Sequence, residues 1–331
     1  MLTVHYHFHR LVLPADASAT DDGSDSFLIR NYIPGLKSIR LTDLEPTHSN
    51  KTPMRDLILG SYAHVRKAQC VIFTSFHELE SNTIDSLKRD LPYPVFSVGP
   101  CIPFMALQEH TASTLTQDDN QEEEKQGGSY MAWLDAQPAN SVLYVSLGSF
   151  LSVSSAQLDE IAIGLAQSNV RFLWVLRDAC SHNVQDLVRG SDCVIIPWCD
   201  QLKVLCHPSV GGFFTHCGMN STLEALYAGV PMLALPIALD QPINCRLIVD
   251  EWMVGYNLKE KIRPDGIIGR VEISEAVKRL MNCGDGEGIR MRASMMKDVS
   301  RGATEVGGSS YNDITSFIDY ISQLNNQIVR N

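Results

Sequence analysis

The stretch Trp198–Gln241 constrains the fold more than any other part of the 331-residue chain. It contains an apolar segment (Ser209–His216), a glycine-containing turn (Cys217–Asn220), a helical segment (Ser221–Ala228) and a second apolar segment (Val230–Pro236). Two short apolar runs around a helix predict a βαβ unit with buried parallel strands. A strand that turns through glycine into a helix presents free backbone N–H groups at the carboxyl edge of the sheet. We therefore expect an anionic ligand beside this turn.

Both ends of the expected helix carry capping residues. Ser221 and Glu224 fit the S-x-x-E capping box, in which the two side chains satisfy free backbone N–H groups. Gly229 stands where glycine commonly ends a helix, and Pro231 prevents its continuation. The capping box accounts for Ser221 and Glu224 without any ligand, so their role stays open at this point.

An acidic composition excludes several kinds of partner. The chain has 27 Lys and Arg against 38 Asp and Glu, a net charge of −11, which opposes approach to nucleic acids and anionic membranes. No apolar run approaches the roughly 20 residues of a membrane helix, and the amino terminus lacks a signal-peptide pattern. We expect a cytoplasmic protein without membrane insertion. Its nine cysteines lack C-x-x-C pairs and are expected to be reduced thiols.

Two groups of residues contain side chains that can bind a metal ion, but neither group has the spacing of a common metal site. His5, His7 and His9 alternate at strand period, but no carboxylate or cysteine ligand follows usefully. A second group clusters in sequence without a common zinc spacing: Cys199, Cys206, His207, His216 and Cys217. We expect no metal.

Apolar and helical segments alternate along most of the chain, as in a parallel α/β sheet. Strands are expected at Cys70–Ser75 and Val95–Val98 around a helix at Glu78–Lys88, and later at Val142–Leu147 and Phe172–Leu176. Length alone suggests about two domains.

The carboxyl-terminal half adds helices with clear starts. Ser154 and Gln157 predict a capped helix start, and Pro242–Trp252 predicts a helix whose first residue is proline. We expect four parts: a partial amino-terminal domain (1–110), a polar linker (111–129), a carboxyl-terminal domain (130–308) and an amphipathic helix (309–331) able to pack back on the first domain.

The Trp198–Gln241 block resembles the signature of plant family-1 UDP-glycosyltransferases, which runs roughly W-x-P-Q, H-C-G-W-N-S-x-x-E and a final acidic residue with Gln. The matching positions are Trp198, Gln201, His207, Val210, Gly211, His216, Cys217, Gly218, Asn220, Ser221, Glu224, Gly229, Val230, Pro231, Pro236, Asp240 and Gln241. VIFTSFHELE, FSVGP and YMAWLDAQPANSVLYVSLGS resemble other segments of the family. The resemblance implies an α/β GT-B fold, two facing Rossmann-like domains, of which the amino-terminal one is incomplete here.

The resemblance also implies a UDP-sugar site. Trp198, which alone would suggest a buried core residue, stacks on uracil in the family. The backbone of Cys199 reads the base edge, Gln201 lies near the ribose, and Glu224 binds the ribose hydroxyls. The positions that contact the diphosphate in the family correspond to His216, Gly218, Asn220 and Ser221. Ser149, at the end of another expected strand, is expected to help line the donor site.

Asp240 and Gln241 hold the sugar hydroxyls in the family, where a final Gln accompanies glucose. The chain departs from the family's pattern at three positions: Asp200 replaces a proline, Met219 a tryptophan and Leu239 an aromatic residue. The last two weaken the apolar wall around the sugar. The implied co-substrate is UDP-glucose, with no separate cofactor.

The family's catalytic base is a histidine held by an aspartate, and both lie before the position in the family's sequences that corresponds to Met1. His5, His7, His9 and Asp43 do not match these catalytic positions. No catalytic residue is assigned. The predicted function is a UDP-dependent hexosyltransferase that glycosylates a hydroxyl of a small plant metabolite with inversion. The alternative is a non-catalytic nucleotide-sugar-binding pseudoenzyme or fragment. An NAD enzyme is disfavoured because no G-x-G-x-x-G follows a strand. The acceptor and the oligomeric state stay open.

Overall fold

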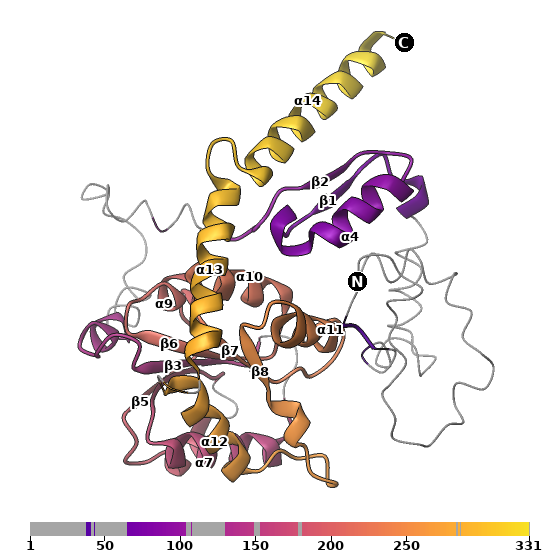
Figure 1. Ribbon diagram of the computed structural model, residues 1–331. Helices are drawn as coiled ribbons and strands as arrows, with labels where there is room; N and C mark the ends of the chain where they lie inside the picture. Colours follow the sequence, from indigo (N-terminus) through magenta and orange to yellow (C-terminus); the bar gives the residue numbers. More distant parts are fainter. Residues whose placement is uncertain are drawn as a thin grey trace, which may run out of the picture. The chain divides into compact units, whose positions relative to one another are not determined.

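The computed structural model describes two compact units (Figure 1). One combines Met1–Cys101 with Asp298–Asn331, and the other is Ile102–Lys297. The described residues are 38–40, 43, 65–103, 107, 130–148, 153–177, 181–282, 284 and 286–330. The expected linker 111–129, Ser149 and the three early histidines lie outside them.

The larger unit is built on a six-stranded sheet in the order β5-β4-β3-β6-β7-β8. All neighbouring strands pair in parallel. The strands are β3 (Val142–Ser146), β4 (Arg171–Val175), β5 (Cys193–Ile196), β6 (Val210–Thr215), β7 (Met232–Ala234) and β8 (Gly255–Asn257). The chain runs outward from β3 to β5 and returns to β6 on the other side of β3. Ligands bind at this reversal in open α/β sheets.

Helices cover both faces of this sheet (Figure 1). They are α7 (Ser155–Ser168), α8 (Ser181–Leu187), α9 (Gln201–Leu205), α10 (Met219–Ala228), α11 (Gln241–Arg246), α12 (Arg270–Met281) and the part of α13 (Glu287–Thr304) that ends at Lys297. A π-helical turn (Leu247–Glu251) prolongs α11, and a 3-10 turn (Leu258–Lys261) follows β8. Packing of α7 and α12 on the sheet buries Phe172, Trp174 and Phe214. The expected parallel α/β order is confirmed.

The ends of two helices follow the predicted capping. The Ser154 hydroxyl oxygen accepts a hydrogen bond from the Gln157 N–H at 3.2 Å. Gly229 closes α10 with φ at 79°, in the left-handed region. Both predictions are confirmed.

The predicted starts of two other helices are wrong. α10 begins at Met219 with Gly218 as its N-cap and no side-chain cap, so Ser221 and Glu224 do not form a capping box. The turn after β6 needs only three residues because Cys217 adopts a φ of 67°, and the helix therefore starts before Ser221. α11 likewise begins at Gln241 rather than at Pro242.

The smaller unit pairs two strands in parallel, β1 (Val71–Phe73) and β2 (Val95–Ser97). A 3-10 turn (Val65–Lys67) precedes β1, and α4 (His77–Asp90) connects the strands. Its core contains Ile84, Leu87, Leu91 and Val95.

The last helix, α14 (Ser309–Arg330), packs on β2 of the smaller unit. The Asp313 carboxylate accepts a hydrogen bond from the Ser97 N–H at 2.7 Å. The Phe317 ring meets Phe96 edge to face at 5.5 Å between centroids. The division of the chain into four parts stays a prediction. None of the described helices combines the length and the apolar character needed to cross a bilayer.

Candidate functional site

A pocket of about 1020 Å³ opens at the carboxyl ends of β3, β4, β5 and β6. This is the point at which the strand order reverses, and its volume is in the range of small-molecule sites. The predicted site residues that line it are Trp198, Cys199, Gln201, His216, Gly218, Asn220, Ser221 and Asp240. The fold therefore brings together, from three separate segments that follow β5, β6 and β7, most of the residues selected from the sequence.

Trp198 lies on the rim of this pocket directly after β5 and Pro197. Its side chain is 69% exposed, so the interpretation as a core residue is wrong. A large exposed aromatic ring beside a pocket provides a flat face for a planar ligand.

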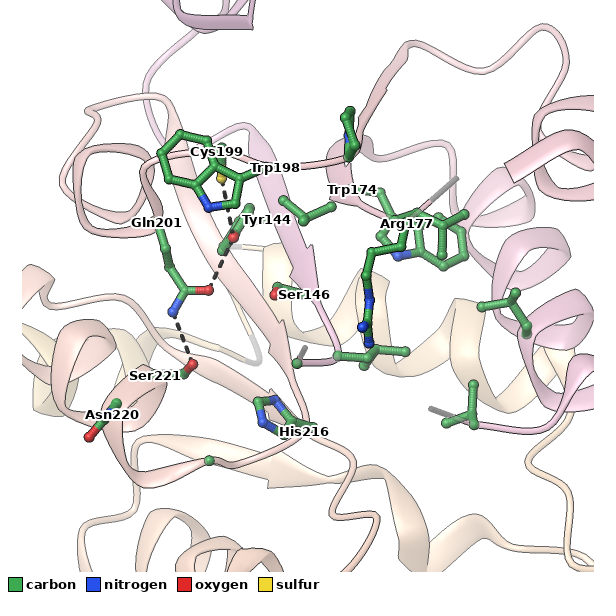
Figure 2. Close-up of a pocket in the computed structure, with 18 of the residues that line it drawn as sticks. Tyr144, Ser146, Trp174, Arg177, Trp198, Cys199, Gln201, His216, Asn220 and Ser221 are labelled. Carbon is green, nitrogen blue, oxygen red and sulfur yellow. Dashed lines mark hydrogen bonds between the residues drawn. The ribbon is translucent and has the colours of Figure 1, made fainter. Parts of the chain in front are cut away.

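Gln201, the first residue of α9, connects two walls of the pocket (Figure 2). Its amide nitrogen donates to the Ser221 hydroxyl at 2.9 Å and to the Glu224 carboxylate. Its amide oxygen accepts from the Tyr144 hydroxyl at 3.1 Å. Ser221 and Glu224 do not cap α10. Instead, both side chains accept hydrogen bonds from the Gln201 amide.

Glu224 is half-buried one turn into α10 and does not itself line the pocket. Desolvation by burial raises the pKa of its carboxyl group, and the hydrogen bond from Gln201 opposes that shift. A partly desolvated carboxylate held by one donor keeps acceptor capacity for ligand hydroxyls.

His216 occupies a space that exists because two neighbours are glycines. A Cβ at Gly148 would come within 2.6 Å of the imidazole Nε2, and a Cβ at Gly218 within 2.7 Å. Burial lowers the pKa of His216, although the charge of Asp240 and the Ser146 backbone oppose this. The neutral imidazole then offers one N–H donor to the pocket. Its Nδ1 has no hydrogen-bond partner within the described parts of the chain.

The amino terminus of α10 opens into the same pocket. Gly218, Met219, Asn220 and Ser221 all line it, and the N-cap supplies no side-chain acceptor. The first-turn N–H groups of a helix lack intrahelical partners and carry a positive partial charge. They form a site for a phosphate group.

Asp240 and Gln241 differ in their placement. The Asp240 carboxylate lines the pocket and accepts from the Asn244 amide at 2.8 Å. Gln241 is 5% exposed, and its amide oxygen accepts from the N–H groups of Ile237 at 2.7 Å and Ala238 at 3.0 Å. Gln241 therefore fixes the loop before α11, and its side chain is not part of the pocket lining.

Arg177 and Tyr144 are among the lining residues that the sequence did not single out. Arg177 follows β4 and extends into the pocket on the side opposite Gln201 and Ser221 (Figure 2). It brings a permanent positive charge to an acidic protein. A basic residue directly after a predicted strand was the available signal. Tyr144, inside β3, gave no signal because its neighbours depend on the pairing of distant strands.

None of the seven cysteines that the structure describes is paired in a disulfide. Within the same residues, no three His, Cys, Asp or Glu side chains are grouped to hold a metal ion.

The strand order, the pocket at its reversal and the helix amino terminus facing that pocket define a Rossmann-like domain of the nucleotide-binding kind. Comparison with known proteins identifies the family. Residues 114–286 match the family model described as UDP-glucoronosyl and UDP-glucosyl transferase. The chain is 41% identical to UDP-glycosyltransferase 87A2 of Arabidopsis thaliana over 325 residues, 96% of this chain and 66% of the relative. The chain belongs to this family of plant UDP-glycosyltransferases.

Solved structures give the same fold. Medicago truncatula UGT71G1, complexed with UDP-glucose, superposes with a TM-score of 0.79 at 28% identity, covering 97% of this chain and 68% of the other. Phytolacca americana UGT2, complexed with UDP-2fluoro-glucose and pterostilbene, gives a TM-score of 0.77 at 28% identity, covering 97% and 69%. The GT-B fold class expected from the sequence is confirmed. The chain spans about two thirds of the length of the relatives it matches.

Proposed function

We propose that this chain binds a UDP-sugar, UDP-glucose, in the pocket of its larger unit and serves an inverting transfer of the sugar to a hydroxyl of a small plant metabolite. One observation carries this function. The exposed Trp198 ring and the uncapped amino terminus of α10 line a single pocket. A flat aromatic surface and a phosphate site in one pocket suit a nucleoside diphosphate.

The nucleoside would occupy the side of the pocket formed by β5, α9 and α10. Trp198 stacks on the uracil, and the backbone of Cys199 contacts the base edge. Glu224, assisted by Gln201, accepts hydrogen bonds from the ribose hydroxyls, which suits an acceptor-only carboxylate.

The diphosphate would lie between His216 and the first turn of α10, at Asn220 and Ser221. A role of Ser149 in lining the donor site is proposed from the sequence alone. Arg177 supplies positive charge from the opposite side, and Asp240 faces the sugar. Gln241 would act on the sugar indirectly, through the loop that it holds.

The chemistry follows from this placement. The acceptor oxygen attacks the anomeric carbon on the face opposite the diphosphate, the bond to UDP breaks, and a base removes the acceptor proton. Negative charge develops on the leaving diphosphate, where the helix amides and Arg177 stabilise it. The base is not assigned to a described residue.

The solved relatives support the substrate classes by their ligands. One holds UDP-glucose, and the other holds UDP-2fluoro-glucose with pterostilbene. A small hydroxylated acceptor and a UDP-sugar donor are proposed for this chain on that basis. The cytoplasmic location expected from the sequence stays a proposal.

Calorimetry with UDP tests the donor site. Trp198→Ala should weaken UDP binding by about 5- to 150-fold, because loss of aromatic stacking on a base is worth roughly 1–3 kcal/mol. Ile262→Ala, which removes another exposed apolar side chain outside the pocket, should leave the affinity unchanged. Absence of UDP binding by the unaltered chain at millimolar ligand would refute the proposed function.

A radiolabelled UDP-glucose assay against phenols and alcohols separates transfer from binding alone. Transfer by this chain refutes the non-catalytic alternative. UDP binding without transfer to any acceptor, while a full-length relative is active in parallel, supports that alternative.

A further inference from the structure

The hydroxyl of Tyr144 lies at the centre of a hydrogen-bonded chain beneath the pocket (Figure 2). Tyr144 is on β3 and 1% exposed, and its ring stacks on Phe213 with 5.0 Å between centroids. The hydroxyl lies 3.4 Å from Cys199 Sγ and 3.1 Å from the Gln201 amide oxygen. It therefore touches the segment after β5 and the start of α9 at once.

The direction of each hydrogen bond follows from chemistry. An ionised carboxylate only accepts, so the Gln201 amide must turn its NH₂ group toward Glu224 and Ser221. Its oxygen then faces Tyr144, which must donate. Since the phenol has one proton, the thiol of Cys199 must donate to the phenol oxygen. The carboxylate at one end and the phenol donor at the other thus favour the same orientation of the Gln201 amide.

We propose that the Tyr144 hydroxyl is a positioning group for the nucleotide: it holds the Gln201 amide in the one orientation that presents Glu224 to the ribose hydroxyls. This rests on the proposed function. The ribose hydroxyls then meet an acceptor whose neighbour Gln201 is already oriented before the nucleotide binds. Preorganised contacts bind a ligand more tightly because less freedom is lost on binding.

The competing explanation is that Tyr144 only fills the core. Tyr144→Phe separates the two, because it keeps the ring on Phe213 and removes only the donor. The Gln201 amide oxygen and the Cys199 thiol then lose their partner. A structural role predicts a lower melting temperature with equal loss for all ligands. A positioning role predicts a loss that depends on the ribose hydroxyls.

Calorimetry on the full chain with UDP and 2′,3′-dideoxy-UDP provides the test. Tyr144→Phe should weaken UDP binding about 3- to 10-fold, the size of one net hydrogen bond, and change dideoxy-UDP binding by less than about 2-fold. Gln201→Ala should give a similar selective loss, and the double variant should lose no more than the larger single loss, because the two side chains act in series. Equal loss for both ligands, or full additivity, would overturn the proposal.

Tyr130→Phe is the matched control. Tyr130 is also buried, and its hydroxyl accepts from the Asp200 N–H at 3.3 Å, so the variant loosens the same segment without touching Gln201. It should retain UDP affinity, and a ribose-dependent loss equal to that of Tyr144→Phe would contradict the positioning role.

Replacement of Tyr144 by 4-aminophenylalanine restores a donor and should restore UDP affinity, whereas 4-methylphenylalanine should not. This pair also serves if Tyr144→Phe fails to fold. If the unaltered chain does not bind UDP, the proposed function fails. If it binds UDP and Tyr144→Phe binds equally well, only this inference fails.

Discussion

His216 depends on the absence of side chains at Gly148 and Gly218. Gly148 has a φ of 85°, and a Cβ there would press into the imidazole. Gly190 has nearly the same backbone, with a φ of 88°, yet a Cβ there would meet nothing within 4 Å. The two glycines therefore separate backbone strain from displacement of His216.

We expect Gly148→Ala and Gly190→Ala each to lower the free energy of unfolding by about 1–2 kcal/mol, the strain of a left-handed alanine. Only Gly148→Ala should also weaken UDP binding, by roughly 10-fold, the loss of one charge-assisted hydrogen bond. Urea melts and calorimetry on both variants check this. Equal UDP affinities in the two variants would contradict the placement of His216.

Arg177 is the residue whose contribution should depend on phosphate charge. Arg177→Gln should weaken UDP binding by about 10-fold, since a hydrogen bond to a charged group is worth roughly 1.5–3 kcal/mol and exposure reduces it. Uridine binding should not change, because uridine carries no phosphate. Competition binding with the two ligands measures the difference, and parallel losses for both would place Arg177 at the base instead.

At the scale of elements, α7 and α12 pack so closely that one glycine is required between them. A Cβ at Gly164 in α7 would come within 2.8 Å of the Ile273 side chain and 2.9 Å of the Arg270 carbonyl oxygen. A Cβ at Gly302 in α13 would meet nothing within 4 Å. The same substitution should therefore have opposite effects in the two helices.

Gly164→Ala should lower the free energy of unfolding by about 1–3 kcal/mol through overpacking. Gly302→Ala should raise it by about 0.5–1 kcal/mol, because alanine favours the helix. Thermal and denaturant unfolding of the two variants provides the comparison. Stabilisation by both would mean that α7 and α12 lie further apart than described.

The sequence predicted helices and strands correctly where the local preference of the residues agrees with their packing in the fold. The strands beneath the pocket are apolar runs, and Ser154 and Gly229 mark helix ends by local chemistry alone. The start of α10 could not be predicted, because Ser221 fits a local cap while the turn at Cys217 starts the helix earlier. The turn decides that start, and strand pairing decides which neighbours Tyr144 has.

At the scale of the whole molecule, the net charge of the chain opposes the binding of an anionic nucleotide, whereas the groups that line the pocket favour it. The net charge of −11 repels a nucleotide at long range, an effect that salt screens within about 10 Å at 0.1 M. Recognition must therefore come from groups inside the pocket, namely helix amides, one arginine and one imidazole. The family block was visible in the sequence because its residues are contiguous. Arg177 lies outside that block, and the available signal for it was only its position directly after a predicted strand.

The packing of α14 on β2 also orders events during synthesis of the chain. Asp313 and its partner Ser97 are 216 positions apart, so at about 5–20 residues per second the ribosome needs roughly 10–40 s to deliver the second after the first. Throughout that interval, the surface of β2 and α4 on which α14 packs stays uncovered. The six-stranded unit lies wholly between them in the chain and can fold meanwhile. The unit that contains β1, β2 and α4 is thus completed only after the whole six-stranded unit has been made.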